Sequence, residues 1–465
     1  MIYYARIQKR EHVPNVEHGD KTMIIKRDIL LNRLIKAKPH HLVKILTGMR
    51  RCGKSYLLFN LFKKHLLESG VDRDHIVEIN LESRKYSSVR DAISLYEVVW
   101  NKLKNDRKMK YVLIDEIQLA KKALPKGIDI ERIHPDDRED VFTTFYDVLN
   151  GLLNRDDVTT YVTGSNAKLL STDVATVFRG RSEVIEVSPL SFAEFYPLRN
   201  KSLDFAQILK EYFLYGGLPE CALIADEDGK RNYLDNLNST IYLRDIADRY
   251  NLKNDELLAS LTDTIMSSIG GLVNPNKIAN TINTVSHLNA NHAIVARYIG
   301  YLEDAFLVKR VRRYDVKGRR YLEQLFKCYA TDTGIRNSRL GYRQVEPTHI
   351  MENVIYNELV RRGYSVDVGI MESRPRNGGV QQKVSNEIDF VVNKAPERVY
   401  IQSAFMIDGP EKRAQETKSL RLVKDGFRKI VITGEPYEKP WMNDDGITFM
   451  GLGPFLLDPH SIDTL

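Results

Sequence analysis

One stretch near the start constrains the fold more than any other: VKILTGMRRCGKS, residues 43–55. A β-branched run leads into a glycine-rich loop that ends in Lys54 and Ser55. Gly48 and Gly53 let the backbone curl so that successive N–H groups point inward. Residues after the loop have helical apolar spacing, so bound phosphates would lie at a helix N-terminus, which favours anions. The stretch therefore predicts a phosphate-binding loop between a strand and a helix.

Each loop residue has an expected role in holding a phosphate chain. Lys54 would reach the β and γ phosphates, and the Ser55 hydroxyl would ligate Mg²⁺. ATP and Mg²⁺ are therefore the predicted cofactors. The residues expected to contact the nucleotide are Gly48, Met49, Arg50, Arg51, Cys52, Gly53, Lys54, Ser55 and Tyr56. The alternative is an ordinary turn, which accounts for neither the strand before the loop nor the helix after it.

Two acidic residues end a later strand. Residues 75–81 alternate as a strand, a helix follows, and residues 110–116 (KYVLIDE) form a buried strand that ends in Asp115 and Glu116. Strand ends converge at one edge of a parallel sheet, which places Asp115 beside Ser55 and the metal. Glu116 would accept a proton from the water that attacks the γ-phosphate, so hydrolysis is predicted. The alternative is an acidic strand end at a solvated edge.

Polar residues also end a third strand, residues 159–166 (TTYVTGSN). Asn166, or Ser165 beside it, would orient the attacking water or sense the γ-phosphate. These side chains emerge where the strand would meet the nucleotide.

Two arginines follow a short predicted helix, residues 173–178: Arg179 and Arg181. A side chain at the end of this helix would point away from its own phosphate loop, so it could complete only the site of a neighbouring subunit. An arginine supplied in this way accelerates hydrolysis by about 10³ to 10⁵. This interpretation predicts a homo-oligomer, and a solvated basic turn is the alternative.

Taken together, these motifs resemble a prokaryotic AAA+ ATPase subfamily in which the ATPase module precedes a C-terminal domain of unknown function. The resemblance covers about residues 24–457 and is carried by GMRRCGKS, VLIDE followed by IQ, YVTGSNAKLLS, FRGR and SPLSFAEFY. It implies Walker A at Gly48, Gly53, Lys54 and Ser55, Walker B at Asp115 and Glu116, sensor 1 at Asn166, and a finger at Arg179 or Arg181. The resemblance also implies an α/β fold with a P-loop parallel sheet.

Residues 203–250 are helical in pattern, with a break at 215–219, and resemble the small helical lid of AAA+ proteins. Arg244 is a candidate nucleotide contact, and an ordinary surface ion pair is its alternative. The stretch 121–140 departs from the family pattern because it is longer and more charged than a connection needs. It is either a substrate-facing loop or decoration.

Composition limits the compartment and the partners. The 465 residues carry a formal net charge of +7, which permits an anionic partner, and 43% are hydrophobic, which excludes disorder. Three cysteines without metal-ligand spacing suit a reducing cytoplasm. No run approaches the roughly 20 apolar residues of a membrane span, and residues 1–22 lack a signal-peptide core. A cytoplasmic protein with no membrane partner is expected.

A basic hairpin follows two short helices. Asn274 caps the first helix, residues 291–305 form the second, and a turn at 315–318 joins two strands. These elements predict a winged helix. Its wing concentrates positive charge at Lys309, Arg310, Arg312, Arg313, Lys317, Arg319 and Arg320. The phosphate backbone of duplex DNA is the natural counterpart, and packing against a neighbouring subunit is the alternative.

The last part of the chain looks like the restriction-endonuclease-like α/β fold. Glu352 and Asp389 match the acidic positions of that fold, but Gln402 and Ala404 stand where active members carry Glu-x-Lys. A site with two carboxylates and no lysine should bind Mg²⁺ poorly. The domain is therefore predicted to have lost cleavage and to serve in binding or as a scaffold, while active cleavage remains the alternative.

Two classes of function follow. The first is an ATPase that couples nucleotide turnover to the binding or remodelling of DNA. The second is a switch or scaffold in which bound ATP arranges the C-terminal parts for a protein partner, with slow hydrolysis as the reset. The predicted domains are an arm (1–22), the ATPase core (23–200), the lid (201–255), the winged helix (256–345) and the nuclease-like domain (346–465).

Overall fold

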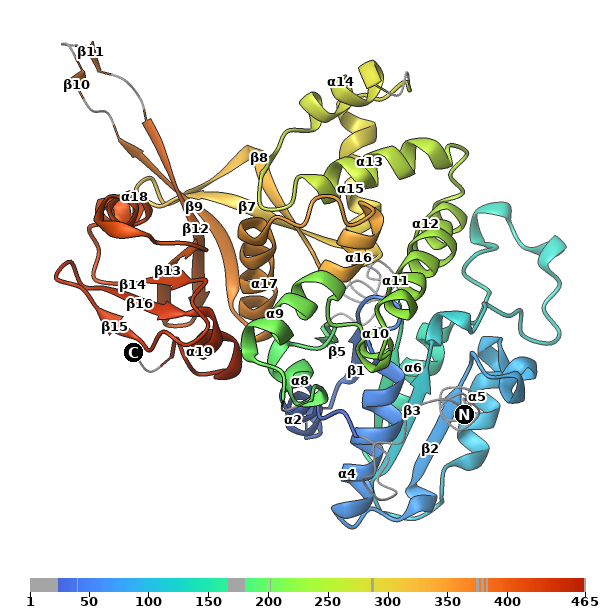
Figure 1. The fold of residues 1–465 in the computed structure, drawn as a ribbon. Helices are drawn as coiled ribbons and strands as arrows, with labels where there is room; N and C mark the ends of the chain where they lie inside the picture. The colour runs from blue at the N-terminus through green and yellow to red at the C-terminus, as the bar shows by residue number, and fades with distance from the viewer. Residues whose placement is uncertain are drawn as a thin grey trace.

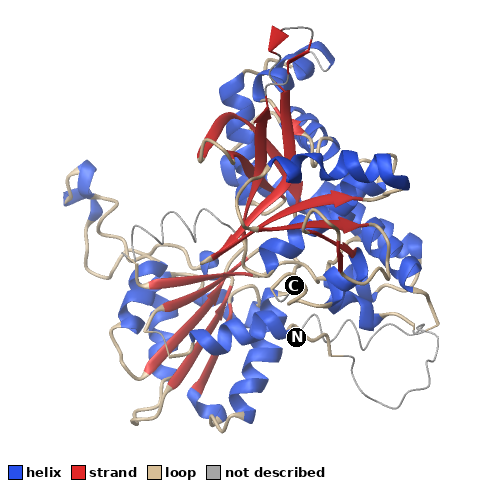
Figure 2. Cartoon of the chain, turned by 90° about the vertical axis from the view of Figure 1, so that its left-hand side faces the viewer, coloured by secondary structure: helices blue, strands red, loops and turns tan. Residues whose placement is uncertain are grey.

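The computed structural model describes residues 24–39, 41–165, 180–200, 202–285, 288–373, 376–377, 380–381 and 384–463. The chain folds around one sheet of five strands and one of nine. Figure 1 traces the path from the five-stranded sheet through a run of helices to the larger sheet. Figure 2 shows the two sheets approaching each other near the middle of the molecule.

The five-stranded sheet is parallel and has the order β2-β3-β4-β1-β5. Its strands are β1 (Val43–Thr47), β2 (Ile76–Asn80), β3 (Lys110–Asp115), β4 (Val158–Thr163) and β5 (Ser182–Glu186). The strands β1, β3 and β4 follow from β-branched runs that are buried along their whole length, as inner parallel strands require, whereas β5 is an edge strand with Val184 48% exposed. The predicted α/β fold with a P-loop sheet is therefore confirmed.

Helices cover both faces of this sheet. On one face lie α2 (Asp28–Ala37) and a continuous helix made of α3 (Lys54–Tyr56), the π-helical η1 (Leu57–Phe62) and α4 (Lys63–Glu68). On the other face lie α5 (Ala92–Lys102) and α6 (Phe145–Leu153). Successive side chains of a strand point to opposite faces, so Ile45 joins one apolar cluster and Leu46 the other.

Short 3-10 helices fill the connections of this half. They are η2 (Arg73–His75), η3 (Arg84–Val89), η4 (Ile117–Leu119), η5 (Ile130–Arg132), η6 (Pro135–Asp137) and η7 (Tyr196–Leu198). The charged stretch 121–140 forms most of an excursion between β3 and α6 that is closed at its base by paired Ala123 and Thr143.

A run of helices follows the sheet. It comprises α8 (Phe192–Phe195), α9 (Phe205–Tyr215), α10 (Pro219–Leu223), α11 (Glu227–Asn236), the π-helical η8 (Leu237–Tyr242) and α12 (Leu243–Tyr250). The predicted break lies at Gly216, which has a left-handed φ of 71°. A Cβ atom on the next residue, Gly217, would lie 2.2 Å from the Leu190 carbonyl oxygen, so this turn requires glycine.

The two helices and the hairpin that the sequence predicts occur as α14 (Pro275–Val285), α15 (His292–Asp304), β7 (Val308–Asp315) and β8 (Arg320–Ala330). They are accompanied by α13 (Asp255–Ser267), β6 (Leu272–Val273) and α16 (Thr333–Arg339). The Asn274 side chain accepts hydrogen bonds from the N–H groups of Asn276 and Lys277, which begins α14.

The remaining described elements are three helices, the strands that complete the nine-stranded sheet, and the separate two-stranded sheet of β10 and β11. They are α17 (Pro347–Arg361), β9 (Ser365–Ser373), β10 (Arg376–Asn377), β11 (Val380–Gln381), β12 (Val384–Lys394), β13 (Glu397–Ala404), α18 (Gly409–Leu422), β14 (Arg428–Thr433), β15 (Trp441–Met442), β16 (Ile447–Gly451) and α19 (Leu452–Leu457). In Figure 1 the short β10–β11 pair projects away from the body.

The hairpin and the C-terminal strands share one sheet. Its order is β15-β16-β14-β13-β12-β9-β7-β8-β6, and β7 pairs in parallel with β9 through Arg313 and Val368. From the sequence, residues 256–345 and 346–465 are expected to be two separate modules. The structure joins their strands by backbone hydrogen bonds, so the hairpin is fixed to the C-terminal part.

A single apolar cluster also joins the two halves, because it runs from Leu30 of α2 through Leu261 of α13 to Phe455 of α19. Over the part of the chain that the structure describes, no helix combines the length and the apolar character needed to cross a membrane.

Candidate nucleotide-binding site

Side chains hold the phosphate loop between β1 and α3 by donating hydrogen bonds to its carbonyl oxygens. The Lys54 ammonium donates hydrogen bonds of 3.0 Å to the carbonyls of Gly48 and Met49. The Tyr242 hydroxyl donates to the Arg50 carbonyl at 3.0 Å, and the Arg27 guanidinium donates to the Cys52 carbonyl at 3.1 Å. The N–H groups that begin α3 have no partner inside the helix. The loop therefore presents donors to an anion while its acceptors are engaged.

Two glycines of the loop are required by geometry. A Cβ atom on Gly48 would lie 2.2 Å from the Val187 carbonyl oxygen, which no rearrangement of a side chain could relieve. Gly53 precedes α3 with a left-handed φ of 100°. Both positions match the sequence prediction.

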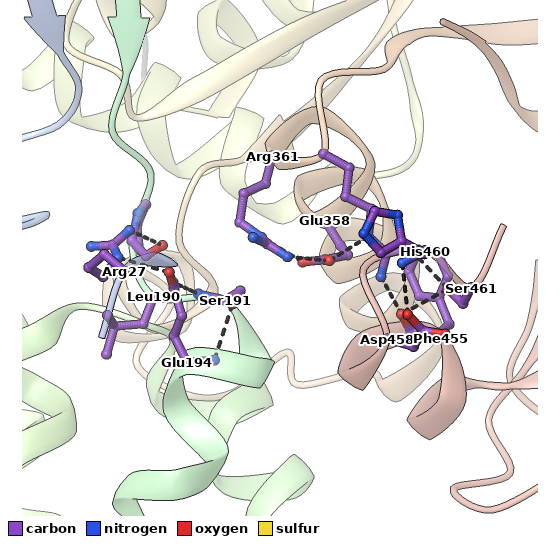
Figure 3. A network of polar contacts seen from close by, with 12 residues as sticks. Arg27, Leu190, Ser191, Glu194, Glu358, Arg361, Phe455, Asp458, His460 and Ser461 are labelled. Carbon is purple, nitrogen blue, oxygen red and sulfur yellow. Dashed lines mark hydrogen bonds and ion pairs between the residues drawn. The ribbon is translucent and has the colours of Figure 1, made fainter. Parts of the chain in front are cut away.

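Arg27 is a support for the loop that sequence analysis missed. Its buried guanidinium also donates to the Ser188 carbonyl at 2.6 Å and to Glu194 Oε1 at 3.1 Å. Glu194 in turn belongs to the capping box with Ser191 that begins α8 (Figure 3). Arg27 thus ties the phosphate loop to the segment that leaves β5. Its sequence signal is weak, because a basic residue ahead of a helix is commonplace.

The carboxyl ends of β3 and β4 meet beside the loop, as predicted. The Ser55 hydroxyl donates to Asp115 Oδ1 at 2.9 Å, and the Thr163 hydroxyl donates to the same oxygen at 2.5 Å. The other oxygen, Oδ2, is buried and has no hydrogen-bond partner among the described residues. Burial, with the charge of Glu116 as a second cause, raises the pKa of Asp115 to about 6 against the opposing hydrogen bonds.

Glu116 turns toward the same edge because its backbone is left-handed, with a φ of 53°. Its N–H donates to the Thr163 hydroxyl at 2.9 Å. Its carboxylate accepts hydrogen bonds from the Ser165 hydroxyl at 3.2 Å and from the Gln118 side-chain amide. Thr163 therefore holds both acids in position. The sequence does not indicate this role, because threonine is an ordinary residue in a buried strand.

The structure describes only some of the residues predicted as sensor and finger. Asn166 and Arg179 lie outside the described residues. Arg181 lies at the start of β5, where its carbonyl accepts a hydrogen bond from the N–H of Val43 at the start of β1. The phosphate loop follows the opposite end of β1, so the exposed Arg181 side chain lies at the far edge of the sheet from its own loop.

The other loop side chains point in different directions. Arg50 forms an ion pair of 2.7 Å with Asp245 of α12, which ties the loop to the helical segment. Arg51 is exposed with a φ of 66°, and Tyr56 is half-buried. Arg244, the candidate contact from α12, is 77% exposed and has Asp248 as its ion-pair partner at 3.9 Å. The structure therefore brings Arg50, rather than Arg244, to the junction of loop and helices.

The seven cations of the hairpin are not equivalent. Three have carboxylate partners: Lys309 with Glu186 of β5, Arg310 with Glu303 of α15, and Arg320 with Asp315. The remaining four have no carboxylate in ion-pairing range among the side chains that the structure describes: Arg312, Arg313, Lys317 and Arg319.

Aromatic rings position two of the hairpin arginines. The Arg312 guanidinium lies 3.9 Å from the centre of the Tyr321 ring, and Arg310 lies 4.7 Å from that of Phe326. Tyr321 is itself 43% exposed. Lys309 instead faces the five-stranded sheet, so the structure does not bring it to the outer surface of the hairpin.

The degenerate nuclease positions are buried around a lysine. Lys327 of β8 donates a hydrogen bond of 2.9 Å to Glu352 and forms an ion pair of 2.7 Å with Glu387. Burial lowers the pKa of Lys327, but the three carboxylates around it, those of Glu352, Asp389 and Glu387, outweigh burial and raise it. Burial and the charge of Glu352 hold the pKa of Asp389 well above its usual range.

Gln402, which stands in place of a metal ligand, accepts a hydrogen bond of 3.4 Å from the Ser419 hydroxyl. Within the described ranges, no group of three or more His, Cys, Asp and Glu side chains is arranged to hold a metal ion. The ammonium of Lys327 therefore supplies the positive charge at this centre. Sequence analysis missed it, because β8 precedes the nuclease-like strands by more than one element.

The sequence matches two family models and two uncharacterized relatives. A sequence model described as an AAA domain matches residues 40–196, and a domain of unknown function matches residues 206–346. An uncharacterized protein of Haemophilus influenzae is 35% identical over 437 residues, which cover 93% of this chain and 99% of that protein. An uncharacterized protein of Methanocaldococcus jannaschii is 26% identical over 451 residues, covering 92% and 90%.

Solved structures are more distant. A Walker-type ATPase of Pyrococcus abyssi aligns with a TM-score of 0.45 and 13% identity, over 68% of this chain and 96% of that chain. The ORC1 protein of Aeropyrum pernix, solved in complex with DNA, aligns with a TM-score of 0.30 and 13% identity, over 69% and 94%.

Proposed function

The chain belongs to the prokaryotic AAA+ ATPases, so it binds and hydrolyses ATP, and we propose that it couples hydrolysis to the binding or remodelling of duplex DNA through a basic winged helix. The observation that supports turnover, as opposed to binding alone, is the geometry of the two acids. Asp115 and Glu116 lie next to Ser55 and share Thr163 as a hydrogen-bond partner.

The residues present fit a magnesium ion. The buried, unpartnered Oδ2 of Asp115 is an oxygen ligand of the kind Mg²⁺ prefers, and the Ser55 hydroxyl lies beside it. These two groups would hold the ion, which supplies positive charge to the phosphate oxygens during hydrolysis.

The protein groups have separate tasks in hydrolysis. Lys54 and the N–H groups that begin α3 bind and orient the phosphates. The Glu116 carboxylate takes the proton of the attacking water, and the hydrogen bonds from Ser165 and Gln118 hold that carboxylate in position. Asn166 is proposed to orient the same water, and Arg179 or Arg181 to complete the site of a neighbouring subunit in a homo-oligomer.

The hairpin supports the DNA part of the proposal. Arg312, Arg313, Lys317 and Arg319 have no carboxylate partner among the described side chains, so phosphates would neutralise them without breaking an existing ion pair. The rings of Tyr321 and Phe326 hold Arg312 and Arg310 over the sheet, which reduces the conformational entropy lost on binding.

The deciding experiment measures steady-state ATP hydrolysis by protein of known oligomeric size, with and without duplex DNA. Changing Arg310, Arg312 and Arg313 together to Ala should weaken DNA binding and flatten its salt dependence by about 0.9 of a slope unit for each lost phosphate contact. Basal hydrolysis should persist. The matched control removes three exposed cations elsewhere, with Arg107, Lys121 and Lys126 changed to Ala. Unchanged affinity and slope in the hairpin variant would contradict the assignment.

A second candidate is an ATP-dependent switch or scaffold that acts on a protein partner. It is favoured by the way the hairpin is fixed, since β7 pairs with β9 and Lys309 forms an ion pair with Glu186 of the ATPase sheet. This candidate predicts slow hydrolysis that duplex DNA does not change.

A further inference from the structure

A cavity of about 260 Å³ lies where the ATPase sheet, the helical segment, the hairpin and α17 meet. Residues of β5 and the segment after it line one side, and Arg33 of α2, Thr331 and Arg361 line others. Figure 3 shows Arg361 and Glu358 of α17 near the segment that carries Leu190 and Ser191. The volume is slightly below the usual range for small-molecule sites and is too small for a nucleotide.

Two hydroxyls of residues that line this cavity have no hydrogen-bond partner in the part of the chain that the structure describes. Ser188 Oγ and Thr331 Oγ1 are both buried, and neither makes a hydrogen bond within the described residues. A buried hydroxyl without a partner costs about 1–3 kcal/mol. Two such groups at one cavity indicate that a polar molecule belongs there.

Among the described side chains that line the cavity, one cation, Arg33, and one carboxylate, Asp332, have no opposite charge in ion-pairing range. Glu186 is paired with Lys309, and Glu358 is shared by Arg361 and Arg362. A third carboxylate, that of Asp332, accepts hydrogen bonds from the N–H groups of Gly217 and Ile335.

Arg33 is the cation left over. It donates a hydrogen bond to the Arg361 carbonyl, but no carboxylate of the described chain lies in ion-pairing range of it. Burial, followed by the positive charge of Arg361, lowers the pKa of Arg33, and the charge of Glu186 opposes this lowering only in part. An anion in the cavity would relieve both effects.

From this combination we infer that the cavity is a binding site for a small oxyanion, a metabolite with a carboxylate or phosphate group, bound by Arg33, Ser188 and Thr331. The site is separate from the phosphate loop, and binding to it requires neither ATP hydrolysis nor DNA.

The same segment connects the cavity to the phosphate loop. The Ser188 carbonyl accepts a hydrogen bond from Arg27, which also holds the Cys52 carbonyl of the loop. The Val187 carbonyl lies against Gly48, with no room for even a Cβ atom. A ligand that binds the Ser188 hydroxyl therefore acts on the position of the loop, and the oxyanion is an effector of ATP turnover.

Calorimetric titration of the full chain carrying Lys54→Ala tests the site without interference from the phosphate loop. Succinate and inorganic phosphate are titrated separately, which distinguishes a carboxylate ligand from a phosphate ligand. At least one should bind with one-to-one stoichiometry. Adding Arg33→Gln should weaken binding about tenfold or more, because a charge-assisted hydrogen bond is lost.

Thr331→Val is the second variant, since it removes an unpartnered hydroxyl without changing the side-chain volume and should leave the fold intact. It should also weaken binding. Lys36→Gln, which removes an exposed cation from the same helix as Arg33, is the control and should bind like the parent. Binding of neither probe, or equal binding by the parent and both cavity variants, would overturn the site.

The coupling is tested in protein with Lys54 intact. The anion that binds should change kcat or KM for ATP about twofold or more, and Arg33→Gln should abolish this effect. Phosphate that competes with ATP at the nucleotide site raises KM equally in the parent and in Arg33→Gln, so this shared part is subtracted first. If no effect remains, or if the remaining effect is the same in Arg33→Gln, the link to the loop is overturned.

Discussion

Asp115 combines burial, an unsatisfied oxygen and a neighbouring acid in one side chain. Its exposed fraction is 1%, and its Oδ2 has no partner among the described residues. A carboxylate in this position is unfavourable until a cation binds. The site is therefore arranged so that its stability depends on its ligands, a common property of functional residues.

The first prediction concerns the pH dependence of Asp115. Its folded pKa of about 6 is above the ordinary carboxyl value, so the folded state binds the proton more tightly than the unfolded state. Without Mg²⁺, the contribution of Asp115 to the free energy of unfolding should fall as pH rises from about 4 to about 6, by roughly 3 kcal/mol in total.

Asp115→Asn should remove this dependence and raise the free energy of unfolding at neutral pH, while abolishing hydrolysis. Urea denaturation in a chelator at pH 4 and pH 7 measures the effect. The exposed Asp156→Asn is the control. A lower stability of Asp115→Asn at pH 7 would contradict the interpretation.

A second prediction separates nucleotide binding from catalysis. Lys54→Ala should abolish nucleotide binding, because the ammonium that contacts the phosphates is lost. Glu116→Gln should retain ATP but stop hydrolysis, since the ligands of phosphate and metal remain. Binding of a fluorescent ATP analogue and phosphate release measure the two effects. Wild-type turnover by Glu116→Gln would show that Glu116 is not the base.

How far the sequence predicts this site depends on the distance between partners. Lys54, Ser55, Asp115 and Glu116 are predictable because each belongs to a local motif with fixed spacing. Arg27 and Tyr242 also hold the loop, but their contacts are with Cys52 and Arg50, far away along the chain. No local sequence pattern predicts such contacts, so these two supporting residues can be recognised only in the folded structure.

At the scale of elements, the boundary between hairpin and nuclease-like strands shows the same limit. The strands β7, β8, β12 and β13 are each predictable from alternation and turns, and each occurs where expected. The parallel pairing of β7 with β9 is not predictable, because the sequence does not indicate which edge of a hairpin pairs with a distant strand. The placement of Lys327 among distant carboxylates escapes prediction for the same reason.

A third prediction concerns that lysine as the link between β8 and the C-terminal strands. Lys327→Met should destabilise the protein by about 3–5 kcal/mol, because it leaves buried carboxylates without a counter-charge. Adding Glu352→Gln and Glu387→Gln should recover part of the loss. Thermal and urea denaturation measure both effects, and the exposed Lys424→Met is the control. A loss no larger than that of the control would show that Lys327 is not essential to this centre.

At the scale of the whole molecule, the position of Arg181 makes assembly testable. The residue directly precedes β5, at the sheet edge opposite the phosphate loop, so within one chain it cannot reach the γ-phosphate. If the proposed finger acts between subunits, activity per molecule should rise with protein concentration.

Mixing variants gives the sharper form of this fourth prediction. Protein carrying Arg179→Ala and Arg181→Ala keeps its site, and Lys54→Ala protein keeps its arginines, so the mixture should recover activity that neither shows alone. Phosphate release over a range of mixing ratios measures the recovery. Activity that stays flat on dilution, with a mixture that remains inactive, would exclude a finger acting between subunits and favour the switch.

The place of β1 between β4 and β5 also has a consequence for how the chain folds. This strand carries the phosphate loop, yet its neighbours come much later: Lys44 pairs with Tyr161, and Val43 with Ser182. During synthesis, the apolar strand β1 stays unpaired until β4 and β5 have been made. Pairing between strands so far apart in sequence is slow, and the unpaired edges can aggregate meanwhile. The nucleotide site therefore forms late in folding. ATP present during refolding should raise the yield of native protein, because it binds chains in which β1 has already paired with its neighbours.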